Sequence, residues 1–277
     1  MAPIFLINGD SCEQISVQDR GLHYGDGIFE TIAVHDHKPL SWSGHIRRLQ
    51  SGCERLGIEC PDKDVIESEV RQLSSASSPS VIKIIVTRGQ GGRGYRVPER
   101  DNTTRIVASY PWPEFPSGNR NPGIISRICR TRIGRNQQLA GIKHLNRLEQ
   151  VLARKEWSDP GIAEGIMLDD TGHVIEGTMS NLFLFRQGQL LTPDLSECGI
   201  AGVTRANILE LAPALDMPVV IKQLALDEMF LAEEIFLCNS VIGIWSVRQI
   251  DKYRFDSGPG TGKIRNALLS AGLIAPA

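Results

Sequence analysis

The chain has 277 residues, of which 41% are hydrophobic and 22% are charged, as is usual for globular proteins. This length exceeds that of most single domains, so we expect two modest domains. The formal charge of -2 is too close to balance for broad attraction to nucleic acid or anionic lipid, which favours a small-molecule partner.

The N-terminal segment MAPIFLINGD lacks a basic leader and soon becomes polar, so it is expected to form a first strand and not a signal peptide. No run of residues has the length of an apolar membrane span. The six cysteines lack C-x-x-C spacing, which argues against a zinc site and for reduced thiols in a cytoplasmic protein. The six histidines show no metal-ligand spacing either, so we expect no metal.

The first half of the chain is predicted to combine two amphipathic helices with strands. Ser41 is a candidate N-cap for the first helix. The residues expected on the buried faces of the two helices are Ile46, Leu49, Cys53 and Leu56, and then Val65, Ile66, Val70 and Leu73. Residues 81–89 and 103–110 are rich in β-branched side chains and are therefore predicted to be strands.

Four prolines between residues 111 and 122 mark the domain boundary. We therefore predict a small α/β N-terminal domain over residues 1–112, a linker over 113–122 and a larger, sheet-rich domain over 123–277. In the larger domain we expect strands at 123–132 and within 164–193, and helices at 144–157, 204–215 and after Pro259. The helix at 144–157 should bury Leu145, Leu148, Val151 and Leu152. The fold class is a mixed α/β arrangement.

Two glycine-rich segments resemble nucleotide motifs only in part. Gly89, Gly91 and Gly94 have G-x-G-x-x-G spacing after a strand, but residues 95–98 (YRVP) follow where a dinucleotide-binding fold needs a helix. In SGPGTGKIR, Ser257 and Ile264 replace the glycine and the hydroxyl residue of a phosphate loop. We reject both motifs and expect a helix to start after Pro259.

Two other features could support chemistry. Gly199 and Gly202 permit a tight turn before a helix, and the first amides of that helix, at Val203 and Thr204, could bind a phosphate. Lys143 lies between a polar loop and a predicted helix, and a partly apolar pocket would make its amine nucleophilic. The residues alone leave two alternatives open, which are a structural helix cap and an ordinary surface lysine.

The order of several motifs carries a resemblance to a known family. The segments are YGDGIFET (24–31), HIRRL (45–49), TRGQGGRGY (87–95), GIKHLNRLEQ (141–150), VIEGTMSNLF (174–183) and GVTR (202–205). Together they resemble fold-type IV pyridoxal 5'-phosphate enzymes, from about Asn8 to Val247. GGRGY and LAGIKHLNRLEQ are similar in particular to the aminodeoxychorismate lyases of that family.

The resemblance implies a role for each matched residue. Lys143 would bind the cofactor as a Schiff base and act as general acid and base, and Glu176 would pair with the pyridine nitrogen. Arg48 would bind the phosphate, and its place on the flank of the first amphipathic helix supports this, whereas Arg47 points to solvent. The other residues implied are Val203, Thr204, Asn239 and Ser240 for the cofactor, and Phe29, Arg93 and Tyr95 for the substrate.

The implied reaction is the elimination that converts 4-amino-4-deoxychorismate to 4-aminobenzoate and pyruvate in folate biosynthesis. The family also implies a homodimer with its site between domains. The nearest alternative is a transaminase of the same family, acting on D-amino acids or branched-chain amino acids. An alternative from another class is a non-catalytic protein whose glycine-rich turns bind a phosphate or nucleotide.

Overall fold

The computed structural model describes residues 4–76, 78–100 and 102–276, and the chain divides into two compact units. The first unit comprises the residues up to Pro113 and, in addition, Ile142–Asn146; the second comprises Glu114–Gly141 and Arg147–Pro276. Within the described ranges, no helix is long and apolar enough to cross a membrane. Both units combine a sheet with helices, which confirms the mixed α/β fold class.

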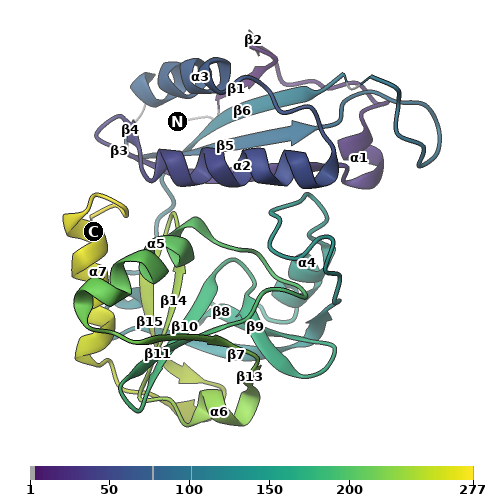
Figure 1. The fold of residues 1–277 in the computed structure, drawn as a ribbon. Helices are drawn as coiled ribbons and strands as arrows, with labels where there is room; N and C mark the ends of the chain where they lie inside the picture. Colours follow the sequence, from purple (N-terminus) through teal and green to yellow (C-terminus); the bar gives the residue numbers. More distant parts are fainter. Residues whose placement is uncertain (1–3, 77, 101, 277) are drawn as a thin grey trace. The chain divides into compact units, whose positions relative to one another are not determined.

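The first unit is built on an antiparallel sheet with strand order β2-β1-β6-β5-β3-β4. Helices α2 and α3 share one apolar core with this sheet, and Figure 1 shows α2 running along the strands. In chain order the elements are β1 (Ile4–Ile7), β2 (Asp10–Ser11), α1 (Arg20–Tyr24), β3 (Gly27–His35), β4 (Lys38–Pro39), α2 (Trp42–Leu56), α3 (Lys63–Ala76), β5 (Ser80–Thr87) and β6 (Thr104–Pro111).

The two predicted amphipathic helices are present, with two local differences. Helix α2 ends because Gly57 adopts a left-handed φ of 62° and its amide donates to the carbonyl of Cys53. At the other end, Ser41 is the N-cap residue of α2, as predicted, but its side chain makes no capping hydrogen bond. On α3, Ile66, Val70 and Leu73 are buried, whereas Val65 is 42% exposed and does not belong to the core.

The second unit is built on a larger mixed sheet, with strand order β12-β11-β10-β14-β15-β7-β8-β9-β13 and with β16 paired to β15. Its elements in chain order are η1 (Ser117–Asn119), β7 (Ile124–Ile133), α4 (Leu148–Arg154), β8 (Ile162–Asp169), β9 (His173–Gly177), β10 (Asn181–Arg186), β11 (Gln189–Pro193), α5 (Val203–Leu211), η2 (Ala212–Leu215), β12 (Val219–Lys222), β13 (Leu224–Ala225), α6 (Leu226–Phe230), β14 (Glu234–Asn239), β15 (Gly243–Ile250), β16 (Tyr253–Arg254) and α7 (Pro259–Ser270).

Helices α5 and α7 lie side by side over one core of the second unit (Figure 1). Helix α7 begins at Pro259, so the predicted helix start is confirmed and no phosphate loop is formed there. Between β10 and β11, Gln187 and Gly188 both adopt positive φ, as a tight hairpin turn requires. The predicted strands and helices of this half are therefore largely confirmed.

The predicted helix over residues 144–157 is the main error in secondary structure. Helix α4 is shorter, and Leu148, Val151 and Leu152 are 75%, 58% and 55% exposed. The residues that it buries are Gln150 and Ala153. Apolar spacing therefore identified the helix but assigned the wrong face to the core.

The segment Ile142–Asn146 belongs to the first unit because it pairs with β3. The amide of Phe29 donates to the carbonyl of Lys143 at 2.9 Å, and the amide of Leu145 donates to the carbonyl of Gly27 at 3.0 Å. These tertiary bonds keep residues 142–146 extended, although their sequence pattern favours a helix. The sequence-based boundaries had placed this segment in the larger domain.

Candidate active site

Lys143 lies in the segment Ile142–Asn146, which pairs with β3. His144 forms an isolated bridge with Ile28, and the side-chain amide of Asn146 donates to the carbonyl of Gly25 at 3.2 Å. The backbone at Lys143 and after it is thus fixed to the YGDGIFET motif. A fixed backbone limits the positions that the lysine amine can reach, as a reactive amine requires.

The side chain of Lys143 lies over an aromatic ring. Its Nζ is 4.3 Å from the centre of the Phe29 ring, and Nζ of Lys83 is 5.3 Å from the same centre. An ammonium group over a ring face is stabilised by the ring quadrupole. The structure therefore places two predicted site residues, Lys143 and Phe29, in direct contact.

Next to Phe29 on β3, the buried carboxylate of Glu30 binds two side chains of α2. Nε and Nη2 of Arg48 donate to its two oxygens at 2.7 and 2.5 Å, and Nδ1 of His45 is 2.6 Å from Oε2. Burial alone would raise the pKa of Glu30, but the charge and hydrogen bonds of Arg48, with His45, lower it to about 2. Glu30 is therefore ionised at neutral pH.

This arrangement limits how Arg48 could hold a phosphate. Glu30 binds the Nε and Nη2 edge of the guanidinium, so a phosphate could not use that edge. Burial, with the charges of Arg48 and Lys143, lowers the pKa of His45. A neutral His45 donates Nδ1–H to the carboxylate, which keeps both Glu30 and Arg48 in place. As the helical phase predicts, Arg47 is exposed.

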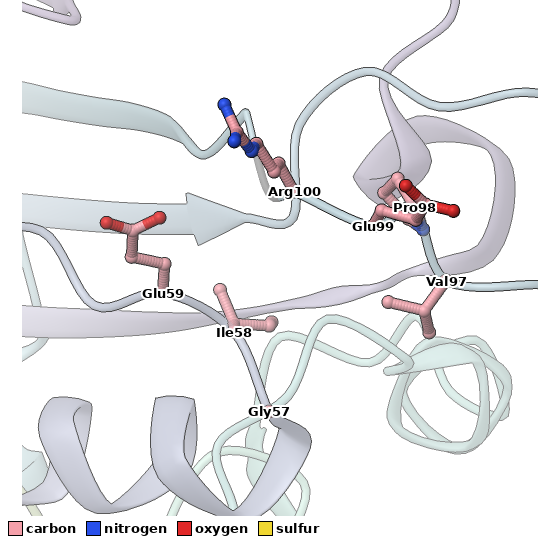
Figure 2. A pocket seen from close by; sticks show the side chains of 7 residues that line it. All are labelled: Gly57, Ile58, Glu59, Val97, Pro98, Glu99 and Arg100. Carbon is pink, nitrogen blue, oxygen red and sulfur yellow. The ribbon is translucent and has the colours of Figure 1, made fainter.

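Residues 89–96, here called the first glycine loop, contain the predicted substrate residues. Arg93 is exposed and Tyr95 is 84% exposed, with its ring centre 5.4 Å from that of Tyr24. No helix follows this loop, which supports rejection of a dinucleotide site. Beyond it, an open hollow of about 580 Å³ is lined by residues 57–59 and 97–100 (Figure 2). None of the predicted site residues lines that hollow.

In the second unit, Glu176 is 3% exposed, and its carboxylate lies against residues 199–202, here called the second glycine loop. Its Oε2 accepts the amide of Ile200 at 2.8 Å. The same loop pairs with Gly141, whose amide donates to the carbonyl of Gly199 at 2.8 Å and whose carbonyl accepts the amide of Ala201 at 3.1 Å. Glu176 and the chain just before Lys143 are thus fixed by one loop.

The second glycine loop leads directly into α5. A Cβ on Gly202 would lie 2.0 Å from Oδ1 of Asn181, so a side chain there would have to displace Asn181. Val203 and Thr204, the first residues of α5, are buried, and no described side chain caps the helix. Amides in the first turn of a helix have no partner within the helix. They therefore form the kind of cradle that binds a phosphate.

The turn after Glu176 is organised by a second buried carboxylate, that of Glu164. It accepts bonds from the amide of Gly165 and from the backbone and side-chain donors of residues 178–180. Asn239 supports the same turn, because its Nδ2 donates to the carbonyl of Met179 at 2.9 Å. Oδ1 of Asn239 accepts the amides of Val241 and Ile242 and so closes a second turn, over residues 239–242. Ser240 lies in this second turn and is half-buried. The structure thus gives Asn239 a turn-forming role within the protein.

Sequence reasoning missed Glu30, although a signal for it exists. Glu30 is in phase with Ile28 and Ile32 on β3, so the alternation of the strand directs it to the buried face. A carboxylate in an apolar row predicts a buried partner, because an isolated buried charge is too costly. Glu164 lacks such a signal, because it lies where β8 becomes continuously buried.

Comparisons with known proteins agree with this geometry. A family model described as amino-transferase class IV matches residues 27–250. An aminodeoxychorismate lyase of Vibrio harveyi is 31% identical and covers 96% of this chain and 99% of its own. The crystal structure of 4-amino-4-deoxychorismate lyase from Pseudomonas aeruginosa has a TM-score of 0.93 at 44% identity, over 98% of this chain and 100% of that chain. A putative branched-chain-amino-acid aminotransferase of Methanocaldococcus jannaschii is 30% identical over 86% of this chain and 83% of its own.

The family match covers most of the chain, and the Vibrio relative is similar over nearly its full length. The chain therefore belongs to the class IV aminotransferase family and is a pyridoxal 5'-phosphate-dependent enzyme.

Proposed function

We propose that this enzyme is a 4-amino-4-deoxychorismate lyase that forms 4-aminobenzoate and pyruvate. The observation that carries the proposal is the 44% identity, over 98% of the chain, with a structure described as that lyase. The exposed arginine and tyrosine of the first glycine loop support it further. The substrate is an acid with a cyclic diene, and these side chains offer a cation for a carboxylate and a ring for stacking.

The residues of each unit fit the cofactor chemically. In the second unit, the uncapped start of α5 and the glycine at its N-cap suit a phosphate, and buried Glu176 suits a protonated ring nitrogen. In the first unit, Lys143 supplies the amine that would carry the cofactor, and Arg48 supplies a positive charge for the cofactor phosphate. We also propose Asn239 and Ser240 as cofactor contacts. When bound, pyridoxal phosphate supplies a ring that accepts the electron pair left by proton removal beside the amine.

The proposed reaction needs one group to move protons. We assign this role to Nζ of Lys143, which would take the proton from C4 of the substrate. The ether bond to the enolpyruvyl group breaks, its electron pair leaves with the oxygen, and the leaving group takes up a proton to become pyruvate. The remaining ring is aromatic, which favours the products. Phe29, which contacts Lys143, would restrict the position of the amine.

The test is to supply 4-amino-4-deoxychorismate to the loaded enzyme and measure 4-aminobenzoate and pyruvate together. Equal release of both is expected, with a loss of at least about a thousandfold in Lys143→Ala because the proton-transfer group is gone. Lys83→Ala is the matched control, since Lys83 also lies over the Phe29 ring. It should cost less than about tenfold. If neither product appears, the proposal is wrong.

A transaminase is the second candidate, because a relative at 30% identity is described as a putative branched-chain-amino-acid aminotransferase. This reaction would use the same lysine. To distinguish the two reactions, the loaded enzyme is incubated with D-alanine or L-leucine in the absence of 4-amino-4-deoxychorismate. Conversion of the bound cofactor to its amine form, with release of one equivalent of keto acid, would favour the transaminase.

We infer that the enzyme is a homodimer and that the apolar face of α4 lies in its interface. Leu148, Val151 and Leu152 are more than half exposed and adjacent on one helix, which is unusual for a surface in water. Light scattering should give twice the 30.5 kDa mass of the chain. Leu148→Glu combined with Val151→Glu should shift the mass towards the monomer. Leu231→Glu, at a residue that is also 64% exposed, is the control and should not.

A further inference from the structure

Arg20, which opens α1, is a buried arginine that binds the first glycine loop by its backbone. Its Nη1 donates to the carbonyl of Gly94 at 3.0 Å and lies 3.4 Å from that of Arg96. Its Nη2 lies 3.4 Å from the carbonyl of Tyr95. One guanidinium therefore faces three consecutive carbonyls, and Arg20 is itself only 4% exposed. Because these contacts involve only the loop backbone, the side chains of Arg93 and Tyr95 remain exposed to solvent.

Tyr24, one turn later on α1, holds the same part of the loop. Its hydroxyl accepts the amide of Gly94 at 3.0 Å, so both backbone groups of Gly94 are bound. The Tyr24 ring contacts the Tyr95 ring, and the guanidinium of Arg20 lies 4.9 Å from the centre of the Tyr24 ring. The residues Arg20 and Tyr24 thus act on the loop as one clamp.

The glycines of the loop make this clamp sterically feasible. A Cβ on Gly91 would lie 2.8 Å from Cδ of Arg20, so the arginine stem occupies the space that a side chain would need. Gly94 has a φ of 99°, which favours glycine. At the start of the loop, the amide of Arg20 donates to the carbonyl of Gly89 at 2.8 Å. The glycine spacing that suggests a nucleotide motif therefore accommodates an arginine.

Arg20 is held in turn by Asp26 of the YGDGIFET motif. Nε of Arg20 donates to Oδ2 of Asp26 at 2.8 Å, and Nε of Arg88 donates to the same oxygen at 2.9 Å. Arg88 also donates to the carbonyls of Leu56 and Gly57 at the end of α2. Arg20 and Arg88 therefore share one carboxylate, but Arg20 donates to the carbonyls of residues 94–96, whereas Arg88 donates to the end of α2.

We propose that Arg20 is a positioning residue that sets the conformation of the first glycine loop for substrate binding, with Tyr24 as its second contact. This inference rests on the proposed function, in which Arg93 and Tyr95 bind the substrate. Arg20 acts through the loop backbone and does not itself contact the substrate. Loss of the clamp should weaken substrate binding more than it slows the chemical step.

The first test is limited digestion of the loaded enzyme with trypsin, which cuts after Arg93 and Arg96 when the loop opens. Rates of cutting there are measured by mass spectrometry and divided by the rate after Lys252, an exposed turn residue of the second unit. Arg20→Lys keeps a charge for Asp26 but lacks the planar fork, and should raise this ratio about tenfold. Tyr24→Phe should raise it by about threefold, since one hydrogen bond is lost.

Arg88→Lys is the matched control, because it disturbs the same carboxylate from an equally buried arginine whose other donors bind the carbonyls of Leu56 and Gly57. It should lower thermal stability and leave the cutting ratio within about twofold of the parent. A ratio that rises equally in Arg88→Lys and Arg20→Lys would mean that Arg20 is merely structural, and would overturn the proposal.

The second test is kinetic, with 4-amino-4-deoxychorismate as substrate. Arg20→Lys and Tyr24→Phe should raise KM by about tenfold and threefold, with kcat within about twofold of the parent. A fall in kcat at unchanged KM would contradict the positioning role. If the parent has no lyase activity but the cutting ratios behave as described, the proposed function fails while the loop clamp stands. If the cutting ratios of both variants equal the parent's, the clamp itself is refuted.

Discussion

The two glycine loops use their glycines for different purposes. In the first loop, Gly91 leaves room for the stem of Arg20, and the loop exposes the side chains of Arg93 and Tyr95. In the second loop, Gly202 packs against Asn181, and the loop presents the backbone amides that open α5. The first loop is thus suited to substrate selection by side chains, and the second to anion binding by the main chain.

This difference shows why a glycine pattern by itself identifies no ligand. What matters is which atom would meet a Cβ at each glycine, and whether that atom can move. At Gly202 the nearest atom belongs to a buried amide that is already bonded to the carbonyl of Ile200. At Gly91 it belongs to an arginine stem, and at Gly92 there is no atom within 4 Å. Substitutions at these three glycines should therefore have graded effects.

Gly202→Ala should have the largest effect. The new methyl group would displace Asn181 and break its 2.8 Å bond to the second loop, at a cost of about 3 kcal/mol. We expect the affinity for pyridoxal phosphate to fall about 100-fold. Equilibrium titration followed by cofactor absorbance measures this directly. Unchanged affinity would mean that the second glycine loop does not bind the phosphate.

Acid should weaken the first unit, where the carboxylates of Glu30 and Asp26 hold arginines in place. The pKa of Glu30 falls from an ordinary 4.5 to about 2, which corresponds to about 3 kcal/mol of stability. Because the folded value is the lower one, this stability is complete above pH 4.5 and is lost as pH falls towards 2. The Arg88 and Arg20 guanidiniums outweigh burial and lower the pKa of Asp26 too, so its contribution has the same sign.

Glu30→Gln tests this assignment. The variant should lose about 3 kcal/mol at pH 7, since Arg48 keeps its charge without a carboxylate. The difference from the parent should shrink as the pH falls from 4.5 towards 2. Urea unfolding at pH 7, 4 and 3 measures both effects. A difference that stays constant with pH would show that Glu30 is not the titrating group.

Gly91→Ala should have an intermediate effect, because the buried stem of Arg20 has to shift by a few tenths of an ångström or more. We expect KM for 4-amino-4-deoxychorismate to rise about fivefold and cofactor affinity to stay unchanged. Steady-state kinetics and cofactor titration of the same preparation separate the two quantities. A loss of cofactor affinity would contradict the assignment of the first loop to the substrate and the second loop to the cofactor.

Gly92→Ala should have the smallest effect and serves as the control for both loops. No atom lies within 4 Å of the new methyl group, and Gly92 is not among the glycines with positive φ. Thermal stability, KM and cofactor affinity should match the parent, with a change in unfolding free energy below about 0.5 kcal/mol. A large change would show that the loop is more closely packed than its exposure indicates.

Most of the fold follows from local sequence patterns. The β-branched runs predict β5 and β6, and the helical spacing of Ile46, Leu49 and Cys53 predicts α2. The pattern fails around Lys143, where pairing with β3 overrides a helical sequence and α4 turns its apolar residues outward. Local preference cannot reveal such a contact, because the partner strand is more than 100 residues away in the chain.

The candidate site could be predicted from the sequence only where a motif matches a known family. Motif order predicts roles for Lys143 and Glu176, and the structure places Lys143 beside Phe29 and Glu176 beside the second glycine loop. The residues that support the site were harder to find. Arg20 resembles an ordinary surface arginine, and only the three-dimensional structure shows that it is buried against the loop carbonyls.

The central claim, that Lys143 carries the cofactor, is tested most directly by borohydride reduction of the loaded enzyme followed by peptide mass spectrometry. The account predicts that the cofactor becomes permanently attached to the peptide containing Lys143, with no attachment in Lys143→Ala. Attachment at Lys83, the other lysine over the Phe29 ring, or attachment that persists in Lys143→Ala, would contradict it.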